Sequence, residues 1–344
     1  MSLSGCATLG WYGQAARGQL EIMSKRQDIA GLIEHPDTDP ALAERLELAL
    51  EIRAFAAAEL DLPDSRSYTR FADLGREAAV WNVIATPRFD MTPKTWCYPL
   101  VGCLAYRGFF RQARAEALAE RLREEGYNAG VFPVSAYSTL GWFADPVLNT
   151  MLNRSDARLA ALIFHELAHE KLFVRGDTQF SEGYAVAVER IGVERWLESR
   201  GEVEALESWR RDEALQARFT ERLLATRDAL IEIYASGHSE AEMLADREHA
   251  FGQLRASLEE LDRAAGDRRF SRWGERELNN SHLALVATYE ASVSGFLQLY
   301  KDCEQDLACF HARSAELAES DEATRREVLG DTARLRPSIA GRID

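Results

Sequence analysis

The 344-residue sequence has no apolar run of about 18 residues, so we expect no segment to span a bilayer. Basic residues are also scarce: 41 Lys and Arg stand against 56 Asp and Glu, which gives a formal net charge of −15. This balance argues against a nucleic-acid partner and against general electrostatic binding to anionic lipid, since both need basic patches. The 46% hydrophobic residues are enough for a substantial globular core.

Cysteine is infrequent, and its odd count of five leaves one residue unpaired. Cys97 and Cys103 are separated by five residues, as are Cys303 and Cys309. In an oxidising compartment these four could form two disulfides and leave Cys6 over, although four buried free thiols would fit the spacing equally well. Without C-x-x-C spacing, they are poor candidates for metal ligands.

The segment His165-Glu166-Leu167-Ala168-His169 has the form H-E-x-x-H. Residues four apart on a helix point the same way, so the two imidazoles could bind one zinc ion. Glu166 lies about a quarter-turn away, where it could act as general base on a water at the metal. The simpler interpretation is an amphipathic helix that carries two surface histidines.

A second signal lies in Phe180-Ser181-Glu182-Gly183-Tyr184-Ala185. Glu182 follows His169 by thirteen residues, which leaves room for a turn and the start of another helix that could supply a third zinc ligand. We expect Gly183 to allow close approach of the two helices at the metal. Glu189, seven residues after Glu182, could orient a ligand histidine. For both glutamates the alternative is an exposed helical carboxylate.

The zinc core resembles that of gluzincin peptidases, in which the third ligand of the large aminopeptidases lies in an Asn-Glu-Gly-Phe-Ala segment. Here Ser181 stands in place of the Asn. More of the chain resembles the predicted aminopeptidase family of bacterial lipoproteins. The stretches that carry this likeness are Ser4–Cys6, Tyr106–Phe110, Ala136–Phe143, the zinc core and Leu278–Leu283.

The resemblance implies an α+β fold, mainly α with a small β-sheet, built on a thermolysin-like zinc-helix core with helical additions. Periodicity predicts helices, and aromatic and β-branched runs predict strands. We expect helices over Tyr12–Lys25, Pro40–Ala58, Arg111–Glu125 and from Asn279, and strands over Tyr68–Phe71, Ala79–Ile84, Trp96–Tyr106 and Val131–Thr139. Residues 21–344 would form one metallopeptidase domain with a helical arm at about 190–266, broken at Ala235–His238.

Leu3-Ser4-Gly5-Cys6 has the form of a bacterial lipobox. It predicts a lipid on Cys6, with residues 1–20 as anchor or linker and the body on the periplasmic side of a membrane, the outer membrane by preference. No charged and apolar signal region precedes it, so we expect the sequence to begin near the mature end. The alternative is an ordinary free cysteine.

In gluzincins an edge strand beside the zinc helix holds the substrate backbone, and Val134–Leu140 is the candidate here. An ordinary core strand is the alternative. Neutral side chains near the metal could bind peptide carbonyls or an oxyanion, and the candidates are Tyr137, His282 and Tyr289. For each of these three, a packed structural role is the alternative.

The sequence therefore predicts a Zn²⁺-dependent peptidase in which His165, His169 and Glu182 bind the metal and Glu166 activates a zinc-bound water against a peptide substrate. An aminopeptidase is expected. Because no Gly-x-Met-Glu-Asn segment is present to hold a free amine, an endopeptidase is an alternative. A second alternative is a non-catalytic envelope lipoprotein with a structural or vestigial zinc site.

Overall fold

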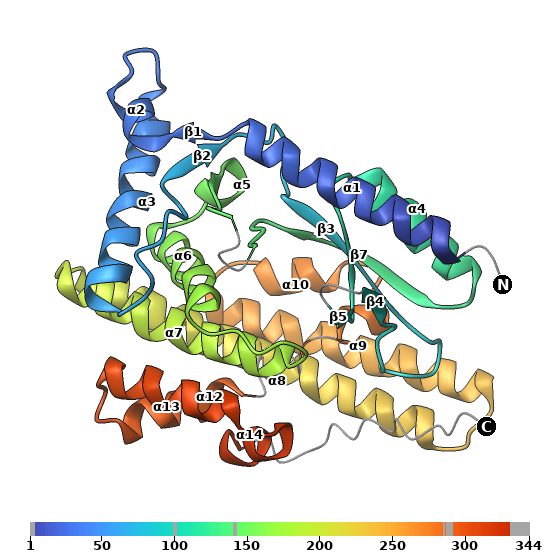
Figure 1. Ribbon diagram of the computed structural model, residues 1–344. Helices are drawn as coiled ribbons and strands as arrows, with labels where there is room; N and C mark the ends of the chain where they lie inside the picture. The colour runs from blue at the N-terminus through green and yellow to red at the C-terminus, as the bar shows by residue number, and fades with distance from the viewer. Residues whose placement is uncertain (1–3, 99–101, 140–142, 285, 287–291, 331–344) are drawn as a thin grey trace.

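A computed structural model of the chain describes residues 4–98, 102–139, 143–284, 286 and 292–330 (Figure 1). Helices predominate and strands are short, as the α+β prediction requires. The helices are α1 Ser4–Ser24, α2 Ile29–Glu34, α3 Pro40–Glu59, α4 Gln112–Glu124, α5 Asn149–Leu152, α6 Asp156–Lys171, α7 Thr178–Ser199, α8 Val203–Ala235, α9 Glu240–Ala265, α10 Arg269–Gly274, α12 Val293–Asp302, α13 Leu307–Glu319 and α14 Glu322–Val328. The strands are β1 Gln27–Asp28, β2 Arg70–Ala72, β3 Val80–Thr86, β4 Trp96–Tyr98, β5 Gly102–Leu104, β6 Arg107–Phe109, β7 Asn128–Val134 and β8 Val147–Leu148.

The strands form three small sheets rather than the single sheet expected. In one sheet, β3 lies between β6 and β7 and pairs antiparallel with both. Trp81 lies opposite Phe109 of β6, and Thr86 lies opposite Asn128 of β7. Helix α4 packs on this sheet through a buried cluster that includes Val83 and Leu122. The other sheets are β1-β2-β8 and the β4-β5 hairpin, which the Cys97–Cys103 disulfide crosslinks.

Helices α6 and α7 form the centre of the main core, with α3 and α12 packed beside them. Leu159, Ile163 and Leu167 recur at helical spacing on α6 and are fully or almost fully buried. A turn at Gly176 (φ +83°) leads into α7, where the Asp177 carboxylate caps the helix by accepting from Phe180 N at 3.0 Å. The apolar period of α6 and the cap of α7 are thus local features of the sequence, although Ser155 at the N-cap of α6 makes no side-chain cap bond.

The polar arm is a hairpin of α8 and α9, broken at residues 236–239 near the predicted position. Figure 1 shows the two long helices side by side. Ser239 and Glu242 form a capping box at the start of α9, and Gly266 ends it in the left-handed conformation. The arm has a hydrophobic cluster of its own, around Leu230, Phe251 and Leu258.

One predicted strand is wrong over most of its length. Strand β7 ends at Val134, and residues 135–139 have no regular structure. The cause is side-chain hydrogen bonding: the Asp145 carboxylate accepts from Thr139 N at 2.7 Å, and the Ser135 carbonyl accepts from Thr150 Oγ1 at 2.5 Å. Such bonds compete with a strand ladder. Leu140 lies outside the described residues.

Helix α1 packs on the body near β6, where Trp11 Nε1 donates to the Gly108 carbonyl at 2.9 Å. Residues 11–20 thus contact the folded domain, and their predicted role as an anchor or linker stays a prediction. None of the helices in the described ranges has the length and apolar character needed to cross a membrane.

Candidate functional site

Three side chains from α6 and α7 converge on one point. His165 and His169 lie one turn apart on α6 with their Nε2 atoms 3.1 Å from each other. The Glu182 carboxylate on α7 lies opposite, with Oε2 3.4 Å from His165 Nε2 and Oε1 3.7 Å from His169 Nε2. The three side chains are largely buried, so their donor atoms are held by packing on both helices.

This geometry fits a zinc ion. Ligands about 2.1 Å from a tetrahedral zinc lie about 3.4 Å from one another, which is close to all three separations. Two imidazole nitrogens and one carboxylate are also the donor types that zinc prefers. Within the described part of the chain, the group has three such side chains and so leaves a fourth position for water or substrate.

Glu189 lies behind the first histidine. Glu189 lies about two turns after Glu182 on α7, and its Oε2 is 3.1 Å from His165 Nδ1. A carboxylate that accepts from Nδ1 selects the tautomer with a free electron pair on Nε2 and fixes the ring. The structure therefore places Glu189 where the predicted orienting role requires it.

The charges of the site suit a cation. Burial by itself would lower the pKa of His165, but hydrogen bonds to Glu182 and Glu189 raise that pKa well above its usual range. Burial would raise the pKa of Glu182, yet hydrogen bonds from His165 and His169 bring it to about 2. Glu182 is thus ionised at neutral pH, as a metal ligand must be.

Glu166 faces a loop that lies outside α6 and α7 in the chain. Its side chain accepts a hydrogen bond from Ser138. Burial raises the pKa of Glu166, more than the nearby His165 and His169 lower it, and the Glu182 charge raises it further. A carboxyl group with a raised pKa is a better general base near neutral pH than an ordinary glutamate.

The same loop is held by a buried aspartate. Asp145 is 2% exposed and accepts from both the backbone N and the Oγ1 of Thr139, at 2.7 and 2.9 Å. Burial raises the pKa of Asp145 to about 6 despite these hydrogen bonds, with added repulsion from Glu170 and Glu166. Ser138 Oγ lies 3.4 Å from Asp145 Oδ2, so one residue connects this aspartate with Glu166.

Tyr106 is a site residue that was not predicted. It lies between β5 and β6, where burial, together with the charges of Glu182 and Glu166, raises its pKa to about 12. Its hydroxyl group therefore stays protonated, within electrostatic range of Glu182, the predicted third ligand, and of Glu166, the predicted base. The stretch Tyr106–Phe110 had contributed to the family resemblance, which was the one sequence signal that could have identified it.

The other candidate residues are more dispersed. Tyr137 is next to Ser138 and packs edge-on against Phe110, 5.1 Å between ring centroids. His282 ends a 3-10 turn over Asn280–His282, in place of the expected helix start, and packs against Phe132 and Trp273. No described contact links His282 with the zinc-site residues, and its catalytic role stays a prediction. Tyr289 lies outside the described residues, as does the side chain of Cys6.

Comparison with known proteins gives one match. The sequence profile of a family described as "Putative aminopeptidase" matches residues 10–329, which include every described element from β1 to α14. No curated protein matches the chain, and no solved structure does.

Proposed function

Because the chain belongs to the family described as "Putative aminopeptidase", we propose that it is a zinc-dependent peptidase whose metal is held by His165, His169 and Glu182. The observation that carries the proposal is the convergence of their three donor groups, 3.1 to 3.7 Å apart, beside a buried Glu166. The same pair of helices supports a gluzincin-type zinc core.

The residues around the metal have distinct roles in this proposal. Zinc bound there would lower the pKa of a water to about 7 and polarise the substrate carbonyl. Glu166 removes the proton from the attacking water and then delivers it to the leaving amine. The protonated Tyr106 hydroxyl donates to the oxygen of the scissile carbonyl as negative charge develops on it. Ser138 holds Glu166 in position.

The non-catalytic alternative is less well supported. A structural zinc site has four protein ligands, whereas this group has three among the described residues. A carboxyl group with a raised pKa beside the ligands also serves no purpose in a purely structural site.

The defining experiment compares Glu166→Gln with the native protein. We expect the variant to retain about one zinc per chain, measured by mass spectrometry, and to lose peptide hydrolysis by about 100-fold or more, since it lacks the base. Glu198→Gln, an exposed change on α7, is the matched control and should keep both properties. Full hydrolysis by Glu166→Gln would refute the proposed base.

The position of cleavage is tested separately. The family supports aminopeptidase action, which requires a free amine at the substrate's N-terminus. A panel of free and N-acetylated peptides should therefore show cleavage of the free peptides alone. Equal cleavage of both sets would indicate an endopeptidase.

We also propose that the protein works on the periplasmic side of a membrane. The disulfides Cys97–Cys103 and Cys303–Cys309 support an oxidising compartment. The lipid predicted on Cys6 is tested by mass spectrometry of the mature N-terminal peptide, and an unmodified Cys6 would exclude it.

A further inference from the structure

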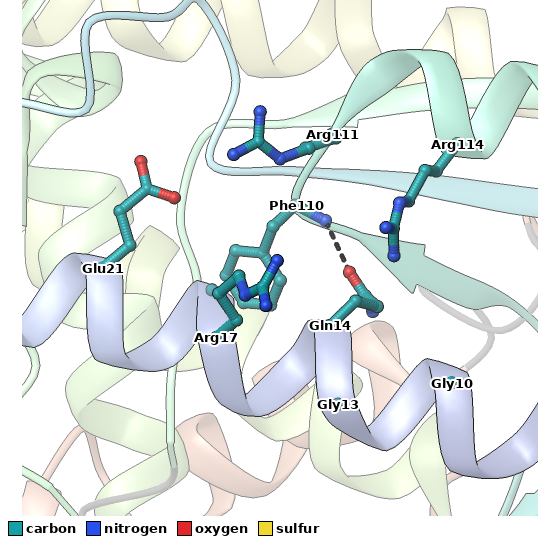
Figure 2. A pocket seen from close by; sticks show the side chains of 9 residues that line it. Gly10, Gly13, Gln14, Arg17, Glu21, Phe110, Arg111 and Arg114 are labelled. Atoms are coloured by element: carbon teal, nitrogen blue, oxygen red, sulfur yellow. Dashed lines mark hydrogen bonds between the residues drawn. The ribbon is translucent and has the colours of Figure 1, made fainter.

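A pocket distinct from the zinc site lies between α1 and the start of α4. Figure 2 shows Arg17 on α1 and Arg111 and Arg114 at the start of α4, arranged around Phe110. Three guanidinium groups thus line one hollow in a chain whose net charge is −15. The overall charge argues against general binding to anions, but it does not exclude a local site of this kind.

These three arginines differ from most others in the protein. Arg45, Arg76 and Arg158, for example, each pair with a carboxylate at 2.5 to 2.9 Å. In the portion of the chain that the structure describes, the guanidinium groups of Arg17, Arg111 and Arg114 form no ion pair or hydrogen bond. The one acidic residue of the pocket, Glu21, has its charge balanced by Arg76 at 2.8 Å.

The end of α4 adds to the positive potential. Arg111 is the N-cap residue of this 13-residue helix and provides no side-chain cap, and the first turn has no acidic residue. The first N–H groups of a helix that lack a cap favour a nearby anion. The Gln14 side chain accepts from Phe110 N at 3.2 Å, which attaches α1 to the residue just before this helix.

Glycines on α1 give the pocket its shape. A Cβ atom at Gly10 or Gly13 would meet nothing within 4 Å, so both positions border open space. At Gly18 the Cβ would overlap the Phe110 ring at 2.1 Å, so this glycine permits the contact between the two elements. Each glycine costs about 1 kcal/mol against alanine in a helix, and packing accounts for Gly18 alone.

We propose that this pocket binds a phosphate group, either free or in a lipid headgroup. The planar guanidinium group matches phosphate oxygens in two-point hydrogen bonds, and three of them suit a group with up to two negative charges better than a single carboxylate. Cys6 lies four residues before Gly10 on the same helix, about 6 Å along its axis. A headgroup source is therefore compatible with the predicted anchor, and the inference does not depend on peptidase activity.

The test compares two triple variants by isothermal titration calorimetry with inorganic phosphate. In the first, Arg17, Arg111 and Arg114 are each changed to Gln. In the matched control Arg218, Arg263 and Arg313, also exposed and without an ion pair among the described residues, are changed to Gln. Both retain the zinc ligands, so phosphate bound there would contribute equally. We expect the first to bind about tenfold or more weakly than the native protein, and the control to bind as the native protein does.

A second arm identifies the source of the phosphate. Co-sedimentation with vesicles of phosphatidylglycerol and phosphatidylcholine, against pure phosphatidylcholine, tests a headgroup. Binding to the charged vesicles that is lost in the pocket variant supports a lipid source, and binding to inorganic phosphate alone supports a free one. Equal binding by the two triple variants, or no binding in either arm, would overturn the proposal.

The Gly13→Glu variant tests the location of the phosphate site while all three arginines remain in place. The Cβ of the new side chain would meet nothing within 4 Å, so the fold should survive, as circular dichroism would verify. Its carboxylate should lower the positive charge of the pocket and compete with phosphate for the arginines, so phosphate binding should weaken about tenfold. Native affinity in this variant would contradict the location of the site.

Discussion

The Tyr106 hydroxyl group, like Ser138, belongs to the proposed mechanism but was not identified from the sequence. Tyr106→Phe keeps the ring and removes the donor, so we expect kcat to fall about 100-fold with little change in KM, because the interaction forms mainly in the transition state. Steady-state kinetics on a free-amine peptide measures this.

Tyr137→Phe is the informative comparison for that variant. Its hydroxyl is also buried, but the charge that raises its pKa, after burial, is that of Asp145 rather than Glu182. We therefore expect a smaller loss of kcat. The reverse order of the two effects would return the donor role to Tyr137.

His311 makes the stability of the protein depend on pH. Its Nδ1 accepts from the Tyr184 hydroxyl at 2.7 Å while its Nε2 donates to the Leu60 carbonyl at 2.9 Å, so the neutral ring is fully satisfied. Burial lowers the pKa of His311 to about 4. The unfolded chain, with a pKa of about 6.5, takes up the proton first, so this contribution is complete above pH 6.5 and is lost as the pH falls towards 4.

The corresponding prediction concerns the free energy of unfolding of metal-free protein at pH 7.5 and pH 4. His311→Gln does not titrate, so its loss of stability between these values should be about 3 kcal/mol smaller than that of the native protein. Urea titrations at both pH values provide the measurement. An identical loss of stability in the two proteins would show that the pKa of His311 is not lowered in the folded state.

Among the helices, the close approach of α6 and α7 depends on a different glycine from the one expected. A Cβ at Gly183 would lie 2.8 Å from Ser292 Cβ, so Gly183 faces the segment before α12 and not the zinc helix. Gly192, two to three turns later on α7, faces α6, because its Cβ would lie 2.7 Å from Phe164. The sequence identified a helix that needs glycine but could not identify its neighbour.

We therefore predict opposite effects for one substitution at two helical positions. Gly192→Ala should destabilise by about 1–2 kcal/mol, because overpacking exceeds the gain in helix propensity. Gly252→Ala, exposed on α9 with nothing within 4 Å, should stabilise by up to about 1 kcal/mol. Urea unfolding of both variants tests this, and an equal gain at both sites would contradict tight α6–α7 packing.

For the molecule as a whole, the proposed metal joins two helices at the centre of the main core. Zinc that binds only the folded state stabilises it, by about 2.7 kcal/mol when free zinc is 100 times Kd. Chelation should therefore lower the Tm of the native protein. Glu182→Ala should abolish this effect of zinc, whereas Glu166→Gln should keep it, as scanning calorimetry would show. If zinc did not change the Tm of the native protein, the proposed metal site would be wrong.

The molecule also shows why α6 and α7, with their candidate metal ligands, were predictable. His165, His169, Glu182 and Glu189 lie on two consecutive helices, where the spacing along the chain determines which side chains share a face. Because the turn between them is short, the second helix packs antiparallel to the first. Helix period, caps and the break in the arm follow from equally local rules.

The rest depended on contacts between distant segments. Tyr106, Ser138 and Asp145 reach the site from loops that precede the zinc helix, and Arg17 meets Arg111 and Arg114 across more than 90 residues. No periodicity relates such positions, and hydrogen bonds donated to the Asp145 carboxylate overrode the strand pattern after Val134. The sequence alone thus determined helices α6 and α7 and the shared face of their candidate ligands through local geometry. The environment of Glu166 and the arginine pocket were decided by packing, which brings together residues that the chain separates.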